Sequence, residues 1–458
     1  MRSIKFKFDF GKFRKTLFQC LYGVIFILLP SCGGEDKNSN PYDKPHNPNQ
    51  AVEVKTISPV SGGIGTKVVV TGSNFGNDTT GVRLYFNHRR ALIMKIQDNA
   101  IYALVPRQPG DFSTIKVVIK GKEAVLEGMQ FQYFIRSVVT TVSGQAGVSK
   151  MVDGPALQAT FGRALALCAK KDGSLIFISD DDNLSGSGRV RMLSTRDNMV
   201  TTLIDGLYRP WQMALNTTED RLFVVEREQI NRPILFYVLS QNTNWVQREI
   251  FYDQRGEDGK YIAGNMPTAG LTADDTYVYM LSREKLIRIH QITKKVEALS
   301  DVLLPGTWSY PAFNKIDKKL YIVSYDESRI YRLDPYHTPA GRTTPWLTVS
   351  DMEHIAGMSR GSAREGNGLN IRFGYPDLPD FDQDGNMYIP DENAQVIWKL
   401  DPEMNGTIIA GRAGVRGYRD GPPLEAEFDY PYAVAITDDG LIYVADTRNF
   451  VVRCVAIQ

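Results

Sequence analysis

Five aromatic side chains recur at comparable places in the C-terminal two thirds of the sequence, each close to the start of a short apolar segment. They are Trp211, Trp308, Tyr310, Tyr375 and Tyr432. Aromatic rings stack on the apolar faces of sugars and on apolar peptide groups. Arg163 and Arg209 stand at equivalent starts and would orient a polar ligand. The set predicts a binding site for a carbohydrate or a peptide, with packing of the rings between neighbouring sheets as the alternative.

A second candidate is an acidic segment in the same region. Asp380, Asp382 and Asp384 alternate with other residues in a way that imitates the carboxylate spacing of a calcium loop. The same place in other parts of the chain holds Asp172-Gly173 and Asp439-Gly440, which are typical of hairpin turns. Because no helices flank the segment as they flank an EF-hand, a turn is the favoured interpretation and calcium a weak alternative.

Other constellations that carry chemistry are missing from the sequence. His290, His337 and His354 do not occupy equivalent positions, which argues against a zinc site built from a histidine cluster. Aspartates recur at the ends of apolar strands and are interpreted as structural: Asp180, Asp181, Asp182, Asp326, Asp391 and Asp446. With no Ser/His/Asp arrangement and no phosphate loop, we expect neither an enzyme nor a cofactor.

A repeated unit positions these residues. Val142–Gly147 and Ile409–Gly414 are similar, and each is followed at the same offset by an Asp-Gly pair and an Ala-x-Phe triplet. An apolar strand, a polar turn and a second strand ending in aspartate come next, as in Leu175–Asp180 and Leu441–Asp446. This pattern resembles the NHL repeat, and the resemblance implies the blades of a β-propeller.

The ends of the repeat region indicate how many blades there are. Six second strands each carry an aromatic residue: Phe177, Phe223, Tyr279, Tyr321, Tyr388 and Tyr443. The last blade has three strands before the sequence stops, and residues 137–143 have the character of the missing fourth. We therefore expect a six-bladed propeller over residues 135–458, closed by an N-terminal strand. Pro390 lies inside a second strand and predicts a bulge there.

Residues 52–134 contain seven short β-rich runs separated by turn signals, which predicts a small sandwich. The segments Ile57–Gly63 and Gly65–Gly76 resemble the IPT/TIG family of immunoglobulin-like domains. The resemblance implies a spacer or an interaction module rather than a catalytic domain. The whole folded chain is thus expected to be all-β.

The N-terminus has the features of an exported lipoprotein. Residues 1–31 have a basic start and an apolar run, which is typical of a signal peptide. The run ends in Leu29-Pro30-Ser31-Cys32 and resembles a bacterial lipobox, so Cys32 is expected to be acylated. The following acidic residues, Glu35 and Asp36, resemble the signal that sends lipoproteins of Bacteroidota-type bacteria to the outer face of the outer membrane. Residues 32–51 are then a flexible tether.

Charge and cysteine content exclude some partners. The 458 residues carry a net charge of +1, and the positive excess lies in the signal peptide, so nothing favours binding to nucleic acid. Cys168 and Cys454 are expected to be buried free thiols.

Together these features predict a non-enzymatic, lipid-anchored surface protein that binds a polysaccharide, a peptide or partner proteins. The layout resembles accessory lipoproteins of SusC/SusD-like importers, and the resemblance implies such a transporter as partner. Two alternatives remain open: a propeller lyase or hydrolase, and a structural scaffold for the transporter subunits.

Overall fold

The computed structural model describes residues 44–106, 108, 111–134, 137–182, 186–226, 234–263, 270–281, 285–300 and 308–457. The predictions for the signal peptide, for Cys32 and for the acidic export signal lie outside these residues. Within them, no helix is both long and apolar enough to cross a membrane. The helical segments that the model describes are 3-10 turns: η1 (Thr79–Gly81), η2 (Gln241–Thr243), η3 (Val349–Asp351), η4 (Gly368–Asn370) and η5 (Pro423–Glu425).

Residues 53–133 form a sandwich of short strands. One sheet has the order β1 (Glu53–Ser58), β3 (Lys67–Ser73), β7 (Ala100–Leu104), β6 (Leu92–Gln97). The second has the order β10 (Lys122–Val125), β9 (Ile115–Ile119), β4 (Val82–Phe86), β5 (Arg89–Arg90), and the third β2 (Ser61–Gly62), β11 (Phe131–Tyr133), β8 (Asp111–Ser113). Alternate residues of a strand face opposite sides, so β4 buries Val82, Leu84 and Phe86 in the core of the sandwich.

Six further sheets make up the rest of the described chain. The first sheet consists of β14 (Ala164–Ala169), β15 (Leu175–Asp180), β16 (Gly188–Ser194) and β17 (Met199–Leu207), with β13 (Gly154–Pro155) at its edge. The second consists of β18 (Pro210–Leu215), β19 (Arg221–Glu226), β20 (Ile234–Ser240) and β21 (Arg248–Tyr252). The third consists of β22 (Gly270–Ala273), β23 (Tyr277–Leu281), β24 (Leu286–His290) and β25 (Val296–Ala298). The fourth sheet consists of β26 (Ser309–Asn314), β27 (Lys319–Ser324), β28 (Arg329–Leu333) and β29 (Glu353–Ala356). The fifth consists of β31 (Asp380–Phe381), β32 (Met387–Asp391), β33 (Val396–Leu400) and β34 (Asn405–Ala410), with β30 (Gly366–Asn367) at its edge. The sixth consists of β35 (Pro431–Ile436), β36 (Leu441–Asp446), β37 (Val451–Ala456) and β12 (Val138–Gly144).

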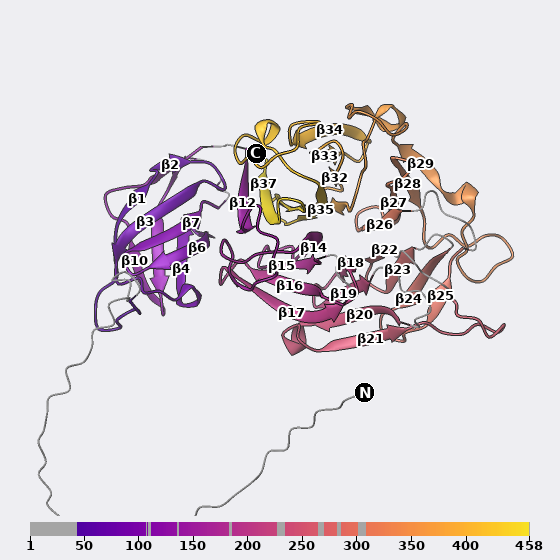
Figure 1. Ribbon diagram of the computed structural model, residues 1–458, viewed down its shortest axis with the longest axis horizontal. Helices are drawn as coiled ribbons and strands as arrows, with labels where there is room; N and C mark the ends of the chain where they lie inside the picture. Colours follow the sequence, from indigo (N-terminus) through magenta and orange to yellow (C-terminus); the bar gives the residue numbers. More distant parts are fainter. Residues whose placement is uncertain are drawn as a thin grey trace, which may run out of the picture. The chain divides into compact units, whose positions relative to one another are not determined.

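These six sheets are the blades of a β-propeller. In Figure 1 they lie around a common centre, with the first strand of each blade innermost. The inner strand β14 contacts β18 on one side and β35 on the other, so the first and last blades are neighbours. The expected all-β fold, a sandwich followed by a six-bladed propeller, is confirmed.

The ring closes through a strand from the start of the propeller. Strand β12 pairs antiparallel with β37, with Val138 opposite Ala456 and Thr140 opposite Cys454. Val139 is fully buried in the core of this last blade. The N-terminal strand therefore covers the outer edge of the final blade, as the repeat predicted.

Three of the inner strands begin with irregular pairing. The register shifts between Ala164 and Ala166 in β14, between Pro210 and Met213 in β18, and between Pro431 and Ala433 in β35. Such bulges re-aim side chains. Pro390, in contrast, keeps regular pairing with β33, so the bulge expected on that side is absent. The interruption lies between β31 and β32, where Pro376 meets Asp391 only through an isolated bridge.

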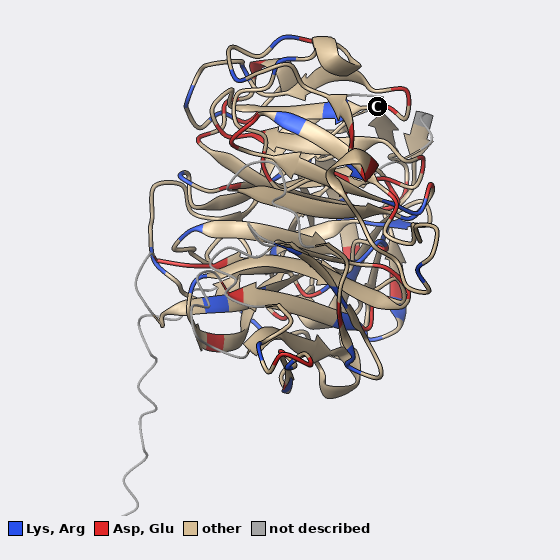
Figure 2. Ribbon diagram, turned by 90° about the vertical axis from the view of Figure 1, so that its right-hand side faces the viewer, with Lys and Arg blue, Asp and Glu red and all other residues tan. Residues whose placement is uncertain are grey.

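Charged residues are mixed over the surface. Figure 2 shows Lys and Arg interspersed with Asp and Glu along the loops and outer strands, without a single-sign patch in that view.

Candidate functional site

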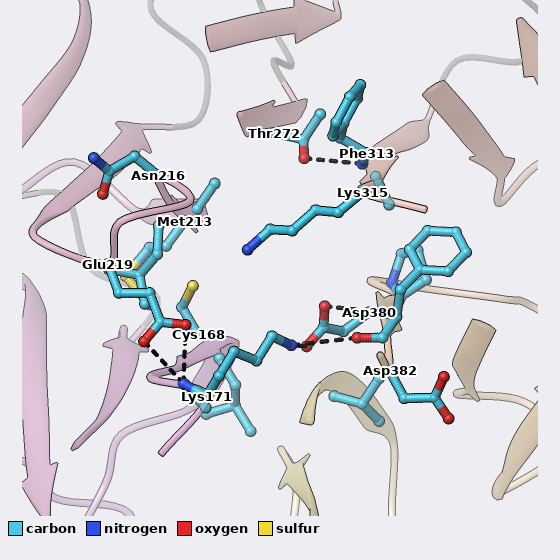
Figure 3. Close-up of a pocket in the computed structure, with 18 of the residues that line it drawn as sticks. Cys168, Lys171, Met213, Asn216, Glu219, Thr272, Phe313, Lys315, Asp380 and Asp382 are labelled. Carbon is cyan, nitrogen blue, oxygen red and sulfur yellow. Dashed lines mark hydrogen bonds and ion pairs between the residues drawn. The ribbon is translucent and has the colours of Figure 1, made fainter. Parts of the chain in front are cut away.

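A cavity of about 320 Å³ opens at the centre of the propeller. It is lined by the C-terminal halves of the inner strands β14, β18, β22 and β26 and by the segment around β31 (Figure 3). Its apolar wall consists of Leu167, Met213, Leu215, Leu271, Phe313 and Phe381. A mostly apolar hollow with a few polar groups is the usual form of a small-molecule site.

Gln212 and Pro311 form the polar floor of this cavity. The side-chain Nε2 of Gln212 donates to the carbonyl of Pro311 at 3.2 Å, and its Oε1 accepts from the backbone N–H of Leu271 at 3.0 Å. Three inner strands are tied together at this level. The floor therefore offers little unsatisfied hydrogen-bonding capacity to a ligand.

Lys171 is held against the cavity wall. Its Nζ donates to Asp380 Oδ2 at 3.3 Å, to the carbonyl of Phe381 at 3.2 Å and to the carbonyl of Ile436 at 2.9 Å. The ion pair with Asp380 raises the pKa of Lys171 although burial alone would lower it. Glu219 accepts from the backbone N–H of Lys171 at 3.0 Å. The ammonium is therefore a structural cross-link between blades and keeps its charge at neutral pH.

The acidic triplet near the cavity serves the local structure. Asp380 accepts from Lys171 and from the backbone N–H of Ile436 at 2.9 Å. Asp382 Oδ1 accepts from the backbone N–H groups of Asp384 and Asn386, at 3.0 and 2.9 Å, as in a hairpin turn. Among the described residues, no group of three His, Cys, Asp or Glu side chains is placed to hold a metal ion.

Cys168 also lines the cavity, and it carries a free thiol, as does Cys454. Burial, followed by the nearby Asp380 carboxylate, raises the pKa of Cys168 to about 12. The thiol stays protonated at neutral pH, and a protonated thiol is a poor nucleophile.

Four of the five aromatic residues that the sequence predicts as a ligand site lie together at the starts of the inner strands, on the other side of Gln212 from the cavity. They are called the collar below: Trp211, Trp308, Tyr310 and Tyr432. The ring of Trp211 lies 6.0 Å from Trp308 and 5.6 Å from Tyr432, measured between centroids. The hydroxyls of Tyr310 and Tyr432 are 2.9 Å apart and share a hydrogen bond. Trp211 is 7% exposed and Tyr310 is 2% exposed, so these two rings are packing residues, whereas Trp308 and Tyr432 keep part of their surface.

Tyr375, Arg163 and Arg209 lie apart from that cluster. Tyr375 packs on Tyr325 at 4.5 Å, and the Arg360 guanidinium lies 4.0 Å above its ring. Arg163 pairs with the buried Asp181 at 2.7 Å. Arg209 has its guanidinium 5.9 Å from the ring of Tyr208 and adopts a positive φ of 49°. Whether any of these residues binds a ligand stays a prediction.

The sequence reasoning missed the cavity and its two lysines. Lys171 lies two residues after β14 and Lys315 directly after β26, and Figure 3 shows Lys171 running along the wall to Asp380 while Lys315 reaches over the open middle of the cavity. The sequence signal for these residues is a long basic side chain within two residues of the end of each of the two inner strands. This signal is weak, because the turns that follow inner strands are generally polar.

A buried carboxyl group lies between the collar and the fifth blade. Asp377 is fully buried, and neither of its oxygens has a hydrogen-bond partner among the described residues. Burial, and then the neighbouring carboxylates of Glu392 and Asp391, raise the pKa of Asp377 well above its ordinary value of 3.8. The side chain is therefore neutral over a pH range in which an exposed aspartate is charged.

Comparisons with known proteins agree with this architecture. Residues 53–133 match the IPT/TIG domain family. A structure of a protein of unknown function from Bacteroides thetaiotaomicron is 26% identical with a TM-score of 0.60, covering 90% of this chain and 100% of that one. Auxiliary nutrient binding proteins from Bacteroides thetaiotaomicron and Bacteroides ovatus share the fold at 20% and 19% identity, with TM-scores of 0.58 and 0.59; each comparison covers 90% of this chain and 99% of the other.

One curated relative matches only part of the chain. Protein SUPPRESSOR OF QUENCHING 1, chloroplastic, from Arabidopsis thaliana is 28% identical over 141 residues. The match covers 31% of this chain and spans only 13% of the length of that relative.

Replacing Trp211 with alanine tests the role of the collar. Because the ring is buried against Trp308 and Tyr432, we expect the substitution to lower the free energy of unfolding by about 3–5 kcal/mol. Denaturant unfolding measures this loss, and calorimetric titration of the variant with a ligand of the parent protein measures any change in affinity. Unchanged stability together with a marked loss of affinity would move the ligand site to the collar.

The stability of the Asp377→Asn variant should depend less on pH than that of the parent protein. A raised pKa in the folded state means that the stabilising neutral form is fully present below about pH 3.8, and stability is lost as the pH rises towards the folded pKa. Asparagine does not titrate, so the difference in unfolding free energy between variant and parent should grow from pH 4 to pH 8, in favour of the variant. Exposed Asp384→Asn is the control, and parallel curves for Asp377→Asn and the parent would contradict the assignment.

Proposed function

We propose that this protein is a non-enzymatic, lipid-anchored surface protein that captures a nutrient in the central cavity of its propeller. The cavity, with its apolar wall and its few engaged polar groups, is the observation that carries the proposal. The names of the two auxiliary nutrient binding proteins that share this fold give it support. In this proposal the nutrient is a glycan or a peptide, and the protein serves a SusC/SusD-like importer in the outer membrane.

Binding rather than catalysis is proposed because the thiol of the cavity is protonated and three of its four carboxylates are engaged by the protein itself. The Cys168 thiol stays protonated, since burial raises its pKa to about 12. Asp380, Asp382 and Glu219 each accept hydrogen bonds from the protein itself. A general base or a nucleophile needs a free lone pair within reach of its substrate.

A second candidate function, a scaffold for transporter subunits, is favoured by one feature of the IPT/TIG domain. In the sheet β2–β11–β8, Phe112 lies directly opposite Gln132 on the neighbouring strand, and both side chains are on the same face. Phe112 is 56% exposed and Phe134, two residues after Gln132, is 46% exposed. Exposed apolar groups of this kind are found where proteins meet.

The Leu215→Trp variant tests the cavity as the binding site. Leu215 lines the cavity from strand β18, and the larger indole would fill part of the 320 Å³. A calorimetric screen of oligosaccharides and peptides should find a ligand for the parent protein whose affinity falls at least about tenfold in this variant, because the occupied space is lost. Leu424→Trp, at a side chain that is 60% exposed outside the cavity, is the matched control. Equal binding by both variants would contradict the proposal.

The anchor is tested separately with Cys32→Ala. The substitution removes the thiol that would receive the diacylglycerol, so incorporation of radiolabelled fatty acid should be abolished. Ser31→Ala, next to the acylated position, is expected to keep the label. Continued labelling of Cys32→Ala would rule out this anchor.

A further inference from the structure

Lys315 is the charged group of the cavity that the protein leaves unpaired. It follows β26 directly, and its Nζ has no hydrogen-bond or ion-pair partner within the part of the chain that is described. Figure 3 shows the side chain reaching over the open middle of the cavity, with no interaction drawn from its amino group. Lys171, on the opposite wall, is instead fixed by one carboxylate and two carbonyls.

None of the described acids around the cavity forms an ion pair with Lys315. The Asp380 carboxylate is paired with Lys171, the Asp382 carboxylate closes its own turn, and Glu219 accepts from a backbone N–H. Asp438 is the remaining acid of the lining, and its side chain is exposed to solvent. The Lys315 amino group is therefore the cation of the described lining that lacks an acceptor, and an anionic group of a ligand can supply one.

The apolar wall defines the rest of the ligand. Met213, Leu215 and Phe313 face the same hollow as the Lys315 amino group. A volume of about 320 Å³ lies at the lower end of the range for ligand pockets, which suits one compact apolar group rather than a long chain of sugars. Lys315 is exposed to solvent, so water and salt screen its attraction for an anion and the apolar wall must hold the rest of the ligand.

From these contacts we infer that the cavity selects a carboxylate attached to a compact apolar group, with the carboxylate on Lys315 and the apolar group against Met213 and Phe313. This inference rests on the proposed function and specifies its ligand class. Two sources share the chemistry: the C-terminus of a peptide with an apolar last residue, and a free carboxylic acid. The polar faces of a neutral oligosaccharide have no counterpart in this wall.

The experiment compares acids with their own amides. Calorimetric titration of the full-length protein uses 3-phenylpropionate against 3-phenylpropionamide, and the dipeptide Ala-Phe against Ala-Phe amide. The acids should bind at least about tenfold more tightly than the amides, since the amides cannot form the charge-assisted hydrogen bond with Lys315. The preference should shrink as salt is raised. The pair that binds more tightly tells the free acid from the peptide.

Variants of Lys315 complete the test. Lys315→Gln should lose the preference for acids over amides, while Lys315→Arg should keep it. Lys318→Gln is the matched control, because Lys318 is exposed in the same turn and does not line the cavity. A preference that survives in Lys315→Gln would overturn the inference.

The two proposals fail in different ways. One outcome is that amides or neutral oligosaccharides bind as tightly as the acids, and that Leu215→Trp abolishes their binding. The cavity would then remain the nutrient site, and only the inferred preference for a carboxylate would be overturned. If neither the acids, the amides nor the oligosaccharides bind, the inference and the proposed function are both overturned.

Discussion

The fold depends on a carboxylate that ends the second strand of a blade and accepts hydrogen bonds from the backbone just before the inner strand. Asp180 accepts from the N–H groups of Gly162 and Arg163 at 2.8 and 3.0 Å. Asp391 does the same for Gly374 and Tyr375, at 2.7 and 2.8 Å. A buried N–H without such an acceptor costs about 1–3 kcal/mol. The carboxylate thereby fixes where the inner strand starts, and with it the side chains that face the channel.

Buried arginines extend this interaction in the first and last blades. Both arginines lie on the third strand of their blade and are fully buried. Arg191 pairs with Asp180 at 2.9 Å, and Arg453 pairs with Asp446 at 2.8 Å. In the fifth blade the indole of Trp398 takes the place of the arginine and donates to Asp391 at 3.3 Å. The Arg191 guanidinium also donates to the carbonyls of Thr160 and Val152, so it ties the loop before the inner strand to the third strand of the blade.

The sequence contained enough to predict the fold because the repeat signals are local. Aspartates at the ends of several second strands and a paired turn are visible within about ten residues, and the strand missing from the last blade is visible at 137–143. The meeting of Trp211, Trp308 and Tyr432 was also predictable, since each belongs to an inner strand or its start. Which of these rings is buried was not predictable, because Trp211 is buried beside a bulge at Pro210 that propensity does not reveal, whereas Trp308 and Tyr432 stay partly exposed.

The two ends of the channel differ because each inner strand presents different residues to them. On β18, Trp211 belongs to the collar and Leu215 to the cavity, and four residues of strand separate them by about 13 Å. Gln212 lies just below the collar and binds across to the neighbouring strands. A ligand in the cavity therefore meets a closed floor, so the polar turns after the inner strands, where Lys315 lies, are the part of the propeller positioned to select it.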